Sequence, residues 1–134
     1  MKIEEQVLSI EQMKHLQELG VDTSDASMCW VADNEGESEE DWHVTIPNNF
    51  LMPYNTIPTY TIGDLIEKLP KSIDIGYGEY DLEILIKGEY TEVEYTNGSD
   101  YTPFSCYLSL IESLYSILCW LAENHKELLE VRNE

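Results

Sequence analysis

The chain has 134 residues, of which 27 are Asp or Glu and only 7 are Lys or Arg, so its formal net charge is -20. A surface this acidic repels phosphate backbones and anionic lipid, which argues against direct nucleic-acid binding and membrane binding. Because 43% of the residues are hydrophobic, with 9 Tyr and 3 Trp among them, the composition predicts one folded domain over residues 1–134.

The first helix is predicted directly after Ser9. Ser9 and Gln12 form a capping box, in which each side chain accepts a hydrogen bond from the other residue's backbone amide. Apolar residues then repeat at helical spacing, at Ile10, Met13, Leu16 and Leu19. Gly20 supplies the stop that ends this helix.

Two strands are predicted next, over residues 27–33 and 42–46. On the second strand, apolar residues alternate with polar ones, which places His43 on the outward face. Pro47 ends this strand because it has no backbone N–H. The loop between the strands is rich in acids, and these form a candidate acidic interaction surface: Glu35, Glu37, Glu39, Glu40 and Asp41.

A second helix is predicted after residues 48–60, which we interpret as an irregular, apolar segment lying against the core. Thr61 and Asp64 form another capping box, and Pro70 ends the helix. Residues 72–79 are interpreted as turns.

The clearest hairpin is predicted over residues 80–87 and 90–95, joined by a turn at Lys87–Gly88. Along its strands Glu92 shares a face with Glu94, and Asp81 shares one with Glu83. Paired carboxylates can bind a divalent cation. Acids are so frequent in this chain, however, that we interpret these pairs as solvated.

The last helix is predicted to begin at Thr102 or Ser105, and apolar residues cover more than half of its circumference. If the other elements leave part of it uncovered, Tyr107, Ile117 and Trp120 form a candidate apolar interface for a homodimer. The favoured alternative is a monomer. The charged tail, residues 124–134, is predicted to fray.

The order helix, two strands, helix, two strands, helix predicts an α+β fold, with an antiparallel sheet of about four strands from two hairpins and three helices. The residues predicted to be buried together share the apolar faces of these elements: Trp30, Leu65, Leu82, Ile84, Leu114, Ile117 and Leu118.

The cysteines predict no disulfide and no zinc site. Cys29, Cys106 and Cys119 are isolated thiols among apolar neighbours, and no C-x-x-C pair occurs. No apolar signal segment is expected at the N-terminus, so the predicted compartment is the cytoplasm. The common catalytic and phosphate-binding motifs are missing from the sequence, and we therefore expect no catalytic residue, cofactor or metal.

Several segments resemble a group of small acidic proteins encoded in phage-like and mobile elements of gut bacteria of the Bacteroides group. These segments are MKHLQELGVDTS (13–24) running into ASMCWV (26–31), IPTYTIGDL (57–65) with LPK (69–71), and LIESLY (110–115) with CW (119–120). The resemblance implies a bacterial or phage cytoplasmic origin, and it brings no activity, cofactor or site. The acidic stretch 35–41 departs from the group.

Three functional hypotheses follow. The favoured one is a non-enzymatic, cytoplasmic protein-interaction domain whose protein partner is unknown. Four tyrosines support it, because they gather near the second hairpin and the last helix, although core packing also accounts for them: Tyr90, Tyr95, Tyr101 and Tyr107. The alternatives are an acidic DNA mimic that inhibits a DNA-binding protein, and a carboxylate-based metal hydrolase.

Overall fold

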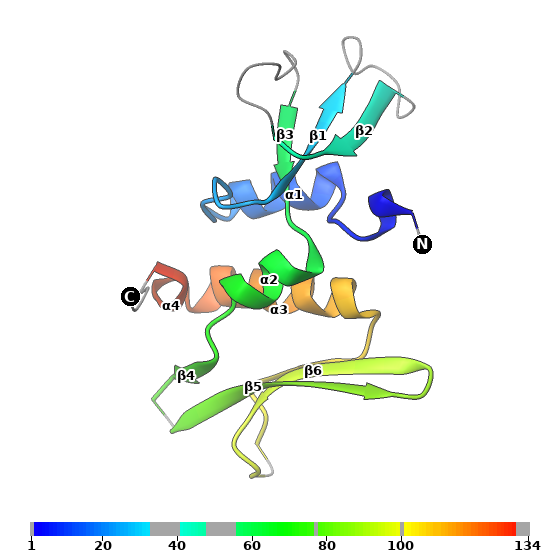
Figure 1. The fold of residues 1–134 in the computed structure, drawn as a ribbon. Coiled ribbons are helices and arrows are strands. Elements are labelled where there is room, and N and C mark those ends of the chain that lie inside the picture. The colour runs from blue at the N-terminus through cyan, green and yellow to red at the C-terminus, as the bar shows by residue number, and fades with distance from the viewer. Residues whose placement is uncertain (1, 33–40, 48–55, 77, 100, 131–134) are drawn as a thin grey trace. The chain divides into compact units, whose positions relative to one another are not determined.

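The computed structural model describes residues 2–32, 41–47, 56–76, 78–99 and 101–130, and it confirms the α+β class. In chain order its elements are the 3₁₀ helix η1 (Ile3–Glu5), α1 (Ile10–Glu18), β1 (Met28–Ala32), β2 (Trp42–Thr45), β3 (Thr56–Thr59), α2 (Ile62–Lys68), β4 (Ser72–Asp74), β5 (Glu79–Lys87), β6 (Tyr90–Thr96), β7 (Phe104–Cys106), α3 (Leu110–Asn124) and α4 (Glu127–Glu130) (Figure 1). The contacts group into two compact units, Met1–Asp64 and Leu65–Glu134, and each is described by itself.

The first unit holds a three-stranded antiparallel sheet in the order β2-β1-β3. The predicted pairing of β1 with β2 is confirmed, and His43 on β2 is exposed as expected. The third strand was not expected, since Pro58 lies within it. Proline is tolerated here because β3 is an edge strand among the described residues, where one missing backbone donor leaves the sheet intact.

Helix α1 begins as the capping box predicts. The Ser9 Oγ accepts from the Gln12 amide at 3.1 Å, and the Gln12 Oε1 accepts from the Ser9 amide at 2.9 Å. Met13 and Leu16 are fully buried, and the helix packs on β3. Gly20 has a φ of 89°, a conformation that glycine adopts without a steric penalty.

The segment before α1 is joined to the sheet through the backbone of Leu8. Its amide donates to the Tyr60 carbonyl at 3.0 Å. Its carbonyl accepts from the Trp30 indole at 2.9 Å and from the Thr59 hydroxyl at 2.7 Å. These bonds satisfy the polar groups of a buried residue and of a half-buried indole, and they fix the chain entering α1 against β1 and β3.

The second capping box is also confirmed, at the start of α2. Asp64 Oδ2 accepts from the Thr61 amide at 3.0 Å, and the Asp64 amide donates to the Thr61 hydroxyl at 3.0 Å. Ser27 adds two further hydrogen bonds to the same carboxylate, from its amide at 3.1 Å and its hydroxyl at 2.7 Å. Desolvation acts to raise the pKa of Asp64, but these hydrogen bonds outweigh it, and the pKa is lowered.

The second unit holds a four-stranded antiparallel sheet in the order β4-β5-β6-β7. The predicted hairpin forms its centre, with Lys87 opposite Tyr90 and Gly88 at a φ of 55° in the two-residue turn. Strands β4 and β7 have three residues each and were predicted as turn and helix start, respectively. Because residues 104–106 pair with β6, the last helix begins later, at Leu110, with Ser109 as its N-cap.

Helix α3 packs on β6 and β7 and supplies more buried apolar side chains to this unit than any other described element. Leu114, Ile117, Leu118 and Leu121 are fully buried, and the sheet contributes Val93 and Tyr95. The Tyr95 hydroxyl donates to the Pro70 carbonyl at 2.7 Å, so the ring is buried without an unpaired polar group.

The predicted core is confirmed for four residues and is less complete for the other three. Leu65, Leu114, Ile117 and Leu118 are fully buried, whereas Trp30, Leu82 and Ile84 are half-buried. Leu82 and Ile84 lie on β5, one strand farther from α3 than β6 is, so the helix covers them less. Farther along β5, Ile86 is 76% exposed.

The tail contains more structure than the sequence predicts. Residues Glu127–Glu130 form α4, which packs on α3 and buries Leu129. Residues 131–134 of the predicted frayed tail lie outside the described part of the chain.

All three cysteines are free thiols, as predicted. Burial raises the pKa of the Cys29 thiol, and Cys29 is only 2% exposed. We therefore expect an aromatic disulfide reagent to react with three thiols in unfolded, non-reduced protein and much more slowly with Cys29 in the native state. Detection of a single thiol after unfolding would contradict the expectation, since it would reveal a disulfide.

Candidate functional site

The predicted acidic interaction surface lies mostly outside the described residues. Glu35, Glu37, Glu39 and Glu40 lie outside the described residues, and Asp41 is half-buried directly before β2. An interaction role for this loop stays a prediction.

The predicted apolar interface is not one exposed patch. Tyr107 is 59% exposed, whereas Ile117 is fully buried and has no surface to offer in this conformation. Trp120 is half-buried and packs against Phe104 at a centroid distance of 5.4 Å and against His125 at 5.1 Å.

A different surface is formed by the second sheet on its face away from α3. Val93 and Tyr95 are buried on the helix side, so Glu92 and Glu94 alternate to the opposite side. The cross-strand partner of Glu94 on β5 is Glu83, which therefore shares that face. In Figure 1, α3 and α4 both lie on one side of this sheet.

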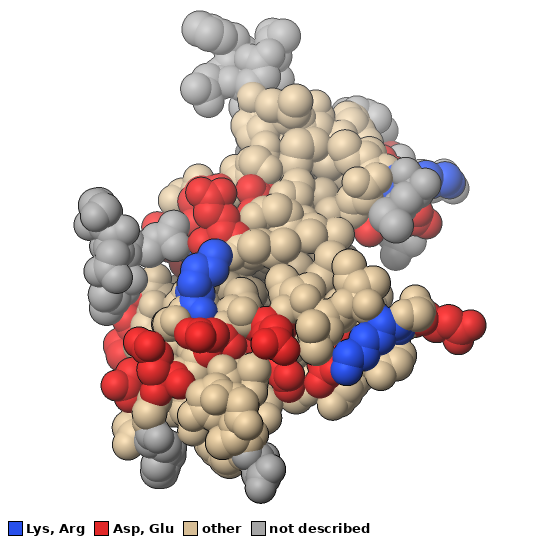
Figure 2. Space-filling model, turned by 60° about the horizontal axis from the view of Figure 1, so that its bottom comes forward, with Lys and Arg blue, Asp and Glu red and all other residues tan. Residues whose placement is uncertain are grey.

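Two tyrosines complete this surface at the hairpin end. Tyr90 begins β6 and lies opposite Lys87, and Tyr107 directly follows β7. The two rings lie 6.0 Å apart between centroids and are tilted by 59°. We name the whole set the acidic–tyrosine face, and its members are Glu83, Lys87, Tyr90, Glu92, Glu94 and Tyr107. The side of the molecule drawn in Figure 2 carries more Asp and Glu than Lys and Arg.

The charges of the acidic–tyrosine face are only partly compensated. Lys87 Nζ lies 3.1 Å from Glu92 Oε1, and this carboxylate belongs to a residue that is only 8% exposed. Neither Glu83 nor Glu94 forms an ion pair with any described residue. Like charges directly opposite each other destabilise a sheet, so the pair of Glu83 and Glu94 lowers the stability of the β5–β6 hairpin.

The pKa values reflect the same repulsion between neighbouring carboxylates. Burial, followed by the charges of Glu92 and Glu83, raises the pKa of Glu94 above its ordinary value. The hydrogen bond and charge of Glu92 raise the pKa of Lys87, which stays positively charged. A perturbed group at a surface cluster is a candidate for function.

The variant Glu94→Gln is expected to be more stable than the wild-type chain at neutral pH. A carboxyl whose pKa is raised by folding opposes folding when ionised, and this penalty disappears as pH falls below the unfolded value of about 4.3. We expect a gain of less than about 1 kcal/mol, since water screens this surface group. Thermal melts between pH 7 and pH 4 measure it, with Glu67→Gln on α2 as the exposed control. A gain that is equal at both pH values would contradict the expectation.

The sequence showed only parts of this surface. Its alternation predicted that Glu92 and Glu94 share a strand face and that the tyrosines lie near the second hairpin. It did not predict that Glu83 and Lys87 share that face. The turn is the feature that would have predicted this arrangement. A two-residue loop at Gly88–Glu89 sets Lys87 opposite Tyr90, and every other pair of the hairpin follows from that register.

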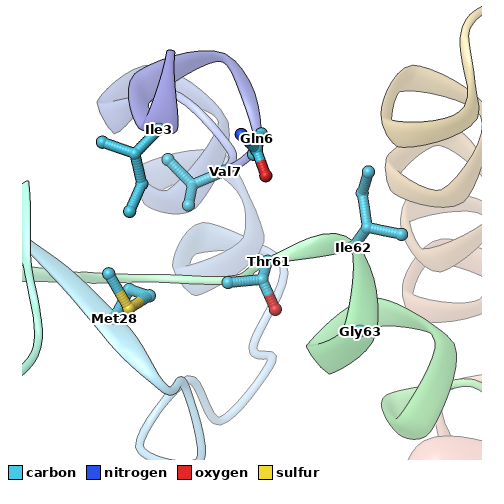
Figure 3. Close-up of a pocket in the computed structure, with 7 residues that line it drawn as sticks. All are labelled: Ile3, Gln6, Val7, Met28, Thr61, Ile62 and Gly63. Atoms are coloured by element: carbon cyan, nitrogen blue, oxygen red, sulfur yellow. The ribbon is translucent and has the colours of Figure 1, made fainter. Parts of the chain in front are cut away.

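The first unit contains a separate small hollow of about 200 Å³ (Figure 3). Its lining is mostly apolar: Ile3, Gln6, Val7, Met28, Thr61, Ile62 and Gly63. It is smaller than the sites that hold drug-sized ligands and has no charged side chain in its lining. Its size suits a single apolar side chain.

No group of three or more His, Cys, Asp or Glu residues able to hold a metal occurs within the described ranges. The same ranges contain no helix with the length and apolarity needed to cross a bilayer.

None of three comparisons, with protein-family models, with curated proteins and with solved structures, finds a match to this chain. The acidic–tyrosine face must therefore be interpreted from its own geometry.

Proposed function

We propose that this chain is a non-enzymatic protein-interaction domain that binds a basic protein surface through the acidic–tyrosine face. The observation that carries the proposal is the pair Glu83 and Glu94, which lie directly opposite each other on the sheet face away from α3 and form no ion pair with any described residue. A Lys or Arg from a partner relieves this repulsion, and this favours binding at the acidic–tyrosine face.

Two further features support a protein partner. The net charge of -20 attracts a basic surface over a long range and accelerates encounter. Tyr90 is 47% exposed and Tyr107 is 59% exposed beside the carboxylates, and tyrosine is enriched in protein interfaces. The resemblance to proteins of phage-like and mobile elements favours a cytoplasmic partner in a Bacteroides-group bacterium.

Affinity capture from a lysate of such a bacterium tests the proposal. Three tagged chains are compared: the wild type, Glu83→Gln/Glu94→Gln, and the control Glu11→Gln/Glu67→Gln, which removes the same charge from exposed helix positions. We expect wild type and control to retain a basic protein at low salt and to release it near about 0.5 M NaCl. The Glu83/Glu94 variant is expected to retain much less. Equal retention by all three chains would overturn the proposal.

The DNA-mimic hypothesis is the special case in which the captured protein binds DNA. Both ligands would then compete for one basic cleft, so added duplex DNA is expected to displace the chain. Failure of DNA to compete leaves the general proposal and removes the special case.

A further inference from the structure

The acidic–tyrosine face combines aromatic and anionic groups within one small area. Tyr90 is 47% exposed and Tyr107 is 59% exposed, and their rings form a tilted pair. Cations bind favourably over tyrosine rings, and carboxylates next to the rings add ionic hydrogen bonds.

The chain's own Lys87 shows how a cation is held there. Its ammonium lies 3.1 Å from Glu92 Oε1, and Lys87 lies opposite Tyr90 across the hairpin. Lys87 forms its ion pair with Glu92, however, and offsets the charge of Glu94 only in part. Glu83 and Glu94 continue the same face without an ion pair among the described residues, so the face can accept a second cation.

Resting on the proposed function, we propose that the acidic–tyrosine face selects arginine over lysine in its basic partner, with the guanidinium packed on Tyr107 and hydrogen-bonded to Glu94. A guanidinium is planar, presents paired donors to a carboxylate, and is more weakly hydrated than an ammonium. The exposed rings supply a flat surface for its face, and Glu94 supplies the acceptor at its edge.

Two synthetic peptides of equal charge, hexa-arginine and hexa-lysine, test this selection on the full-length chain. Fluorescence anisotropy at low salt is expected to show hexa-arginine binding tighter by on the order of tenfold, since a guanidinium–ring contact and paired hydrogen bonds to a carboxylate both contribute. Tyr107→Ala is expected to abolish this preference while weak, salt-sensitive binding of both peptides persists. Tyr107→Phe retains the ring and is expected to keep the preference.

Tyr101→Ala is the matched control, because Tyr101 is 53% exposed but packs against Tyr80 instead. It is expected to leave the preference unchanged. NMR titration of the wild-type chain gives an independent test that needs no substitution. Hexa-arginine is expected to shift the signals of the Tyr107 ring and the Glu94 side chain more than hexa-lysine does.

The outcomes separate the two proposals. If wild type binds both peptides equally and Glu83→Gln/Glu94→Gln weakens both, arginine selection is overturned and the protein-binding proposal stands. If that double variant binds both peptides as tightly as wild type, the proposed binding surface itself is overturned.

Discussion

Replacing Leu114 by alanine is expected to lower the free energy of unfolding by about 2–5 kcal/mol. Leu114 lies on the buried side of α3, with no exposed surface, between the helix and a sheet that supplies Val93 and Tyr95. Truncation removes the transfer free energy of the lost carbons and leaves a cavity that a rigid helix–sheet core closes poorly. Urea denaturation followed by tryptophan fluorescence measures the change.

Leu108→Ala is the control for this prediction. Leu108 precedes the same helix but is 51% exposed, so its truncation is expected to change stability by less than about 0.5 kcal/mol. Equal losses for both variants would mean that Leu114 is not part of a closely packed core.

Tyr60→Phe is expected to cost about 1–3 kcal/mol, although it removes a single oxygen atom. The Tyr60 ring is fully buried, and its hydroxyl lies 2.6 Å from Asp25 Oδ1 and 3.0 Å from the Asp22 carbonyl. Burial, followed by the hydrogen bond to Asp25, raises the pKa of Tyr60 well above its ordinary value, so the hydroxyl remains a donor. The substitution leaves the Asp25 carboxylate and the Asp22 carbonyl without this hydrogen-bond donor.

Tyr107→Phe makes the same chemical change at an exposed ring and is expected to alter stability by less than about 0.5 kcal/mol. Thermal denaturation of both variants at pH 7 measures the difference. If Tyr60→Phe melts at the wild-type temperature, the hydroxyl contacts contribute nothing net to folding.

Local chemistry made the starts of α1 and α2 predictable. Ser9 with Gln12, and Thr61 with Asp64, need only residues three positions apart, so their hydrogen bonds are visible as a sequence pattern. The strands of the central hairpin were equally accessible, because alternation and a glycine turn mark them, although the turn lies at Gly88–Glu89, one residue later than predicted.

The short strands were not predictable, because partners distant in sequence define them. Residues 72–74 and 104–106 are too short for an alternating pattern, and each becomes a strand only beside β5 or β6. The number of sheets depends on the same long-range pairing. The sequence predicts one sheet from two hairpins, whereas the two hairpins lie in separate sheets.

Only part of the candidate site could be predicted from the sequence, for a related reason. Period-two alternation places Glu92 and Glu94 together within one strand, but it does not say which residues face them from the next strand. That Glu83 lies opposite Glu94 follows only once the hairpin is paired. The uncompensated charge is thus a property of two strands together.

The position of Pro58 has a consequence for aggregation. An edge strand whose backbone groups are free can recruit a strand from another molecule, and such recruitment is a common start of fibril growth. Proline in β3 removes one backbone donor from the four residues of that strand, which disfavours a continuous intermolecular ladder along it. The first sheet thereby has one edge that is poorly suited to self-templating.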